Sequence, residues 1–210
     1  MCVILLHNFQ FRENGFAVIP GFLSQTEVEE LKDATKQLVS KYCRDMPISI
    51  FSGKKTEEGR TVLEDRDNYF LDSADKIRGF YEESAVVDGK VIVGDQEKAL
   101  NKIGHALHKF EDAFRQVSFS PKVKEVVERL TTMKRPTVMQ SMVIFKQPKV
   151  GGEVKPHQDA SYLYTEPTSG SLLGFWIALD DANLENGCLY FTPASHQDGK
   201  LYQRYAYNIF

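Results

Sequence analysis

The chain has 210 residues, of which 42% are apolar, and this length fits one domain with a sizeable core. Its net charge of −3 and pI of about 6.0 provide no strong basic field, so neither nucleic acid nor a membrane surface is an expected partner. The three cysteines are scattered along the sequence, which predicts reduced thiols. The sequence shows no signal-like apolar run, no apolar run of membrane length and no Ser-Lys-Leu end. These features predict a cytoplasmic protein.

The N-terminal part of the chain predicts a strand, a helix and a loop. Residues 16–20 are apolar and β-branched in part, and predict a short strand. Ser24 and Glu27 have the spacing of a capping box, and the apolar stripe that follows predicts a helix over 25–42. Residues 44–68 are polar and charged, and we expect a mobile surface segment there.

Short strands and a long helix are expected in the middle of the chain. Residues 69–71 and 77–81 predict strands that flank a turn, and the Asp-Gly pair at 88–89 predicts a hairpin. Apolar residues at helical spacing predict a helix over 97–117. His105 and His108 would share a face of that helix, either as a metal-like pair or as part of a face near the core.

The C-terminal part is richer in predicted strands. Ser120 and Pro121 have the residue types of a helix cap and first turn, and predict a helix to about 131. Apolar, β-branched runs then predict three strands, over 137–146, 172–179 and 188–192. A turn at 180–187 would join the last two. Helices first and strands late favour an α+β fold or a mostly-β sandwich with N-terminal helices.

His157 and Asp159 are the first candidates for a functional site. On extended backbone two residues that are two positions apart point to the same side, so an imidazole nitrogen and a carboxylate oxygen could meet one cation. A second histidine would complete the two-histidine, one-carboxylate arrangement of non-haem Fe(II) oxygenases. The alternative is a surface histidine next to a turn aspartate, because pairs of this spacing also arise by chance.

A series of motifs between residues 9 and about 198 resembles the phytanoyl-CoA dioxygenase family. The motifs include Asn101-Lys-Ile-Gly-His-Ala-Leu-His108, Met142-x-x-Phe145-Lys-Gln-Pro148, His157-Gln-Asp-Ala-Ser161, Tyr164-Thr-Glu-Pro167, Gly174-x-Trp176-Ile-Ala178, Leu184-Glu-Asn-Gly-Cys188 and Pro193-Ala-Ser-His196. The resemblance implies a double-stranded β-helix, that is a cupin-like jelly roll, and an oxidoreductase that uses Fe(II) and 2-oxoglutarate. The reaction implied is oxidative decarboxylation to succinate and CO2, with or without hydroxylation of a small-molecule substrate.

The resemblance also assigns roles to individual residues. His157 and Asp159 match two iron ligands, and Lys102, Met142 and Trp176 match positions that contact 2-oxoglutarate in relatives. Lys102 could offset one carboxylate charge of the cosubstrate, while Met142 and Trp176 would form walls of the pocket. The alternatives are a solvated helix lysine and two ordinary core residues.

The sequence departs from the family pattern near its end. The family's distal iron ligand is a histidine on a late strand, followed by an arginine that binds the cosubstrate. Here His196 is the one histidine after Asp159, and it is either a replacement ligand or a polar anchor at a strand end. We therefore expect an incomplete domain over 1–198 that lacks its last strands, and an unrelated aromatic tail over 199–210 from alternative splicing. The turnover of such a chain would be impaired.

Two other functions are compatible with the sequence. The chain could be a non-catalytic regulatory form that associates with a full-length relative through unpaired strand edges. It could also bind acyl-CoA or acyl chains, although no phosphate-binding motif for CoA is present.

Overall fold

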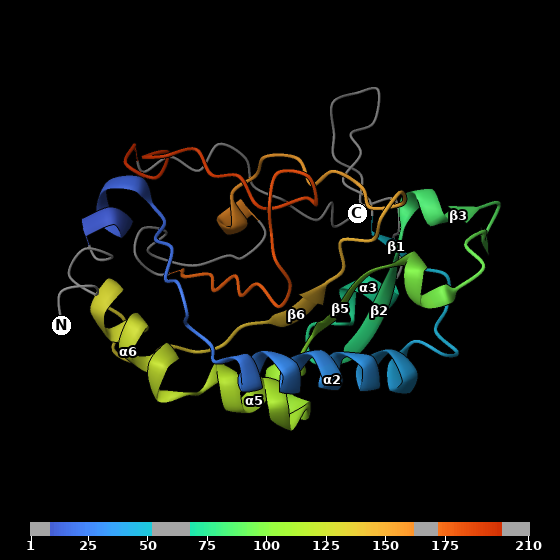
Figure 1. Cartoon of the computed structure of the whole chain (residues 1–210), viewed down its shortest axis with the longest axis horizontal. Helices are drawn as coiled ribbons and strands as arrows, with labels where there is room; N and C mark the ends of the chain where they lie inside the picture. Colours follow the sequence, from blue (N-terminus) through green and yellow to red (C-terminus); the bar gives the residue numbers. More distant parts are fainter. Residues whose placement is uncertain (1–8, 52–67, 162–171, 199–210) are drawn as a thin grey trace, which may run out of the picture.

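A four-stranded sheet with a long helix on one face organises the protein. The computed structural model describes residues 9–51, 68–161 and 172–198. The strands lie in the order β1 (Ile50–Phe51), β2 (Ile77–Glu82), β5 (Leu100–His105) and β6 (Ser141–Ile144) (Figure 1). β1 runs parallel to β2, and the other neighbours are antiparallel. The described residues thus form a mixed α and β fold with antiparallel strands.

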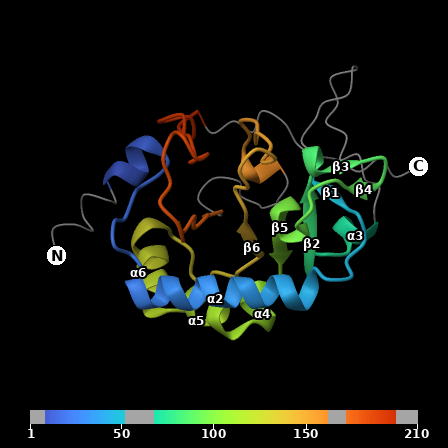
Figure 2. The same ribbon diagram turned by 45° about the vertical axis from the view of Figure 1, so that its right-hand side comes forward.

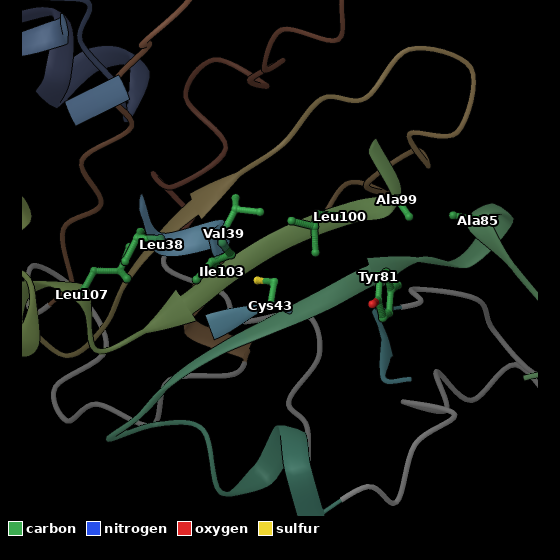
Figure 3. Close-up of a cluster of buried hydrophobic side chains, with 9 residues drawn as sticks. All are labelled: Leu38, Val39, Cys43, Tyr81, Ala85, Ala99, Leu100, Ile103 and Leu107. Carbon is green, nitrogen blue, oxygen red and sulfur yellow. The ribbon is translucent and has the colours of Figure 1, made fainter. Parts of the chain in front are cut away.

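Helix α2 (Gln25–Tyr42) covers one face of this sheet. Ser24 caps it as expected: its hydroxyl accepts the N–H of Glu27, and the Glu27 carboxylate accepts the N–H of Ser24 at 2.7 Å. Figure 2 shows β6, β5 and β2 above α2, with α4 and α5 beside the helix. The side chains that meet between helix and sheet form the main core (Figure 3): Leu38, Val39, Cys43, Tyr81, Ala85, Ala99, Leu100, Ile103 and Leu107.

The predicted helix over 97–117 is wrong in its first part. Residues Gln96–Ala99 form the 3₁₀ turn η2, and β5 follows, with α4 (Leu107–Phe110) and α5 (Asp112–Ser118) after it. Every residue of β5 is buried, because the strand lies between β2 and β6 in the sheet. The hydrogen-bond ladders from both neighbours therefore override a spacing that by itself favoured a helix.

The remaining elements match the predictions in part. The hairpin forms from β3 (Val86–Val87) and β4 (Lys90–Val91), and α6 (Pro121–Leu130) begins after the cap Ser120. The predicted strand over 69–71 is instead the short helix α3 (Asn68–Leu71), and residues 16–20 form no strand. From α2 to β6, strands and helices alternate along the chain. The expected order of helices first and strands late is therefore wrong.

The predicted strands over 172–179 and 188–192 form no ladder with any other described residue. The described residues therefore do not build the two sheets of a jelly roll, and the jelly roll and its missing strands stay predictions. The expected surface segment over 44–68 lies largely outside the described residues, as does the tail over 199–210. Among the described residues, no helix is both long and apolar enough to span a membrane.

The segment around His196 packs against the N-terminal helical turn at 9–14. His196 donates its Nε2–H to the carbonyl of Arg12 at 2.9 Å, and the side-chain amide of Gln197 donates to the carbonyl of Glu13 at 2.8 Å. The N–H of Ala194 donates to the carbonyl of Asn14 at 3.0 Å. These contacts satisfy carbonyl groups at the end of the turn that have no partner within it. His196 is thus a polar anchor in this structure, although the strand end expected beside it is not formed.

Candidate metal centre

The chain brings His157 and Asp159 together in a loop that follows β6. Nε2 of His157 lies 3.2 Å from Oδ1 of Asp159. Residues 151–158 form no strand, and Asp159 begins the 3₁₀ turn η3 (Asp159–Ser161). Both side chains are substantially exposed, by 40% and 69%.

A hydrogen bond orients the imidazole of His157 toward the carboxylate. Nδ1 of His157 lies 2.8 Å from the carbonyl oxygen of Lys155, which can only accept, so Nδ1 carries the proton. The other nitrogen, Nε2, faces Oδ1 of Asp159. Metal-binding histidines commonly have this arrangement, in which a carbonyl holds one nitrogen and frees the other.

The distance between these atoms fits a pair of neighbouring ligands on one divalent cation. Two ligand atoms at right angles on an octahedral centre, each about 2.1 Å from the metal, are about 3.0 Å apart. The observed 3.2 Å is close to that separation. A nitrogen and a carboxylate oxygen are also the donor types of the non-haem iron sites. No group of three His, Cys, Asp or Glu side chains that could hold a metal occurs among the described residues.

Lys102 and Met142 lie on the face of the sheet opposite α2. Lys102 pairs with Phe80 on β2 and with Ile144 on β6, and Gly104 pairs with Met142. Directly paired residues point to the same face, and so do residues two apart on a strand. A Cβ atom on Gly104 would lie 3.0 Å from Cβ of Met142, so the glycine lets Met142 lie close to β5.

Lys102 is buried among aromatic rings. Only 6% of it is exposed, and its Nζ lies 5.3 Å from the ring centre of Phe70 and 5.7 Å from that of Phe80. Burial lowers the pKa of the Lys102 ammonium to about 7, because the charged form loses its hydration. The alternative of a solvated helix lysine is therefore wrong, because this side chain lies in a strand and in the interior.

His105 lies against the same two aromatic rings. Its ring centre is 5.7 Å from those of Phe70 and Phe80. Nδ1 of His105 lies 2.8 Å from Oγ of Ser73, and that hydroxyl donates to the carbonyl of Phe70. Burial first, and the charge of Lys102 second, lower the pKa of His105 to about 4. The imidazole is therefore neutral at pH 7.

His105 and His108 do not form the pair on one helix face that the sequence suggested. His105 ends β5, whereas His108 lies in α4 with its Nδ1 2.7 Å from Oγ of Ser141. Burial lowers the pKa of His108 as well. Each histidine therefore contacts a different serine, which corresponds to the alternative interpretation of two residues near the core.

Trp176 belongs to a segment that passes the His157–Asp159 pair. A Cβ atom on Gly174 would lie 4.0 Å from Oδ2 of Asp159. Trp176 is 45% exposed, so it is not the ordinary core residue that was the alternative. The structure thus places the segment with Trp176 beside the pair, and it places Lys102 and Met142 together on one sheet face.

The comparisons with known proteins agree with the resemblance in the motifs. A family profile described as "Phytanoyl-CoA dioxygenase (PhyH)" matches residues 11–208. This chain belongs to the phytanoyl-CoA dioxygenase family. A protein from Bos taurus named "Phytanoyl-CoA dioxygenase domain-containing protein 1" is 47% identical over 191 residues, and its namesake from Danio rerio is 43% identical over 195. A protein from Arabidopsis thaliana named "Phytanoyl-CoA dioxygenase" is 40% identical over 189.

These family relatives are longer than the chain. The matches cover 90% of the chain, but only 64% of the proteins from Bos taurus and Danio rerio and 63% of that from Arabidopsis thaliana. The chain thus spans slightly less than two thirds of the relatives' length. The chain is therefore a member of the family. The activity in the relatives' names belongs to those longer proteins.

The sequence did not reveal the residues that attach the loop preceding His157 and Asp159 to the sheet. Glu82 at the end of β2 is 4% exposed, and its carboxylate accepts the N–H of Gly152 at 3.1 Å. Asn101 on β5 also donates a hydrogen bond to this carboxylate from its side chain. No sequence pattern indicates such a contact, because it joins residues 70 positions apart.

Proposed function

We propose that this chain binds Fe(II) through His157 and Asp159 and belongs to the Fe(II)- and 2-oxoglutarate-dependent dioxygenases. The observation that carries the proposal is the separation of 3.2 Å between Nε2 and Oδ1, together with the orientation of the ring by the Lys155 carbonyl. With 2-oxoglutarate and O2, Fe(II) supplies oxidative decarboxylation, with or without hydroxylation of a second substrate. Membership in the family supports the choice of this metal and cosubstrate.

The cosubstrate would use the sheet face that carries Lys102 and Met142. A carboxylate beside the Lys102 ammonium would compensate the hydration that burial removes, and so favour the charged form. Met142 on the same face, and Trp176 on the segment beside Asp159, would form apolar walls. The described residues provide two protein ligands for the metal, so we propose that the 210-residue chain by itself binds Fe(II) weakly and turns over poorly.

Replacing His157 by alanine tests the metal site. We expect the dissociation constant for Fe(II), measured by anaerobic titration, to rise on the order of tenfold or more, since even outer partners of metal ligands contribute that much. Release of succinate from 2-oxoglutarate by the wild-type chain is expected to be slow, and to depend on His157. Fe(II) affinity that is the same in His157→Ala would contradict the proposal.

His196→Gln is the matched control for this experiment. The glutamine amide can still donate to the Arg12 carbonyl, which His196 contacts at 2.9 Å, so the anchor to the N-terminal turn is retained. We expect unchanged Fe(II) affinity in this variant. Equal losses in His157→Ala and His196→Gln would instead make His196 a third ligand.

A second candidate function is association with a full-length relative without catalysis. The observation that favours it is the exposure of large apolar side chains in the segment 172–191, which forms no ladder with the described strands. They are Phe175, Trp176, Leu184, Leu189, Tyr190 and Phe191. Contiguous exposed apolar groups and unpaired strand-like segments are typical of surfaces that another polypeptide covers.

We expect the chain to co-elute with a separately tagged full-length relative in size-exclusion chromatography. Leu184 and Tyr190 are each 75% exposed, so Leu184→Ser with Tyr190→Ser should weaken this association without loss of core packing. Exposed Lys124→Met on α6 is the surface control. A chain that stays monomeric beside the full-length protein would rule out this candidate.

A further inference from the structure

A buried carboxylate lies where the loop with the metal pair leaves the sheet. Glu82 is the last residue of β2, and Oε2 accepts the N–H of Gly152, five residues before His157. The side chain of Asn101 donates a second hydrogen bond to the same carboxylate, and Lys146 adds a positive charge nearby. Glu82 thus connects the rigid sheet to the loop through two elements, β2 and β5.

Other contacts attach the same stretch of backbone. Oγ of Ser84 donates to the carbonyl of Val150 at 2.6 Å. The N–H of Gly151 donates to the carbonyl of Gln147 at 3.0 Å, and the amide of Gln147 donates to the carbonyl of Glu97 at 2.9 Å. Residues 147–152 are therefore fixed at several points, whereas residues 153–157 are exposed. Glu82 provides the attachment nearest to the metal pair in this set.

The carboxylate of Glu82 is costly in this position. Burial raises the pKa of Glu82, while the hydrogen bonds from Gly152 and Asn101 oppose this effect. An apolar residue could fill such a position without that cost, since buried charges often add little to stability. An apolar residue, however, has no acceptor for the Gly152 N–H, whereas the side chain of Glu82 reaches it.

We infer that Glu82 is a positioning residue for the His157–Asp159 pair, and that it acts by holding the Gly152 backbone at the end of β2. The inference rests on the proposed metal site. A loop held at Gly152 samples fewer conformations before the metal binds, so less ordering is needed on binding. Loss of this contact should therefore weaken metal binding although neither ligand is changed.

Two conservative variants separate the reach of Glu82 from its charge. Glu82→Gln keeps the length of the side chain and an oxygen that accepts the Gly152 N–H, but it removes the charge. Glu82→Asp keeps the charge but is one methylene shorter, so its oxygens withdraw from Gly152. Exposed Glu153→Gln lies closer to His157 in the sequence and is the matched control for a charge change.

Mn²⁺ binding to the whole chain, measured by electron paramagnetic resonance, tests the inference. We expect Glu82→Asp to bind about tenfold more weakly, as outer partners of metal ligands typically do, and Glu82→Gln to stay within about threefold of the wild type. Glu153→Gln should bind as the wild type does. Thermal unfolding of each variant shows whether stability changes separately from affinity.

The outcomes distinguish this inference from the proposed function. A folded Glu82→Asp chain that binds Mn²⁺ as tightly as the wild type overturns the positioning role, even if its melting temperature falls. Mn²⁺ affinity that is unchanged in His157→Ala overturns the metal site and, with it, the role of Glu82. If Glu82→Asp binds Mn²⁺ more weakly and Glu82→Gln does not, the length of the side chain and not its charge positions the loop. This outcome supports the inference.

Discussion

Lys102→Met is expected to raise the free energy of unfolding at pH 7 by about 4 kcal/mol. The folded-state pKa of about 7 lies well below the usual 10.5, so burial of the ammonium costs about 4 kcal/mol at pH 7 relative to a neutral side chain. Methionine has a similar length and no charge, so the desolvation cost disappears.

The pH dependence of this gain has a defined sign. Between pH 7 and 10.5 the unfolded chain holds the Lys102 proton and the folded chain does not, so wild-type stability rises with pH in this window. The Lys102→Met chain lacks this contribution. The stability difference should therefore be largest at and below pH 7, and should shrink by about 1.4 kcal/mol per pH unit above it.

Urea unfolding of both proteins at pH 6.5, 8 and 9.5 measures this difference. Lys124→Met on α6 is the control, because its ammonium is exposed and its pair with Glu128 at 3.8 Å should contribute little. A difference between wild type and Lys102→Met that does not vary with pH would show that Lys102 is not buried as a desolvated amine. If Lys102 also binds the cosubstrate, the more stable variant should lose 2-oxoglutarate binding, as is common where function requires a strained site.

Local signals in the sequence predicted local structure well. The capping box at Ser24 and Glu27 defined the start of α2, and Ser120 with Pro121 defined that of α6. Asp88 and Gly89 both adopt positive φ, at 48° and 68°, as a tight hairpin turn requires. In each case the residues that carry the signal also make the contact, so no distant part of the chain was needed.

The errors arise where distant residues decide the structure. Leu100, Ile103 and Leu107 have helical spacing, but their segment lies between two strands, and its hydrogen bonds go to them. The apolar runs over 172–179 and 188–192 have strand composition, yet a strand also needs a partner, and none lies among the described residues.

The metal pair shows both sides of this contrast. His157 and Asp159 are two positions apart, and this spacing was enough to predict that their side chains meet. The contact of Glu82 with Gly152 spans 70 positions and involves a backbone N–H, which is the same for every residue type except proline. Only the fold reveals which carboxylate holds the loop.

Gly79→Ala is expected to destabilise the protein by about 2 kcal/mol, because α2 packs directly on this position of β2. A Cβ atom on Gly79 would lie 2.5 Å from Sδ of Met46 and 2.7 Å from Sγ of Cys43. The Met46 side chain is flexible and can move away. Cys43 is 2% exposed at the C-terminal end of α2, so its sulfur can move only if the helix shifts.

A double-mutant cycle with Cys43→Ala identifies this contact as the cause. Cys43→Ala alone should cost about 1 kcal/mol for lost burial, and the double variant should be little worse than that, because the methyl group added by Gly79→Ala fills part of the space. Gly94→Ala is the matched control, since a Cβ atom there has nothing within 4 Å. Urea unfolding should give a coupling free energy of about 1 kcal/mol or more between the two sites. Additive effects would mean instead that Gly79 is required by the strand backbone rather than by the close approach of α2.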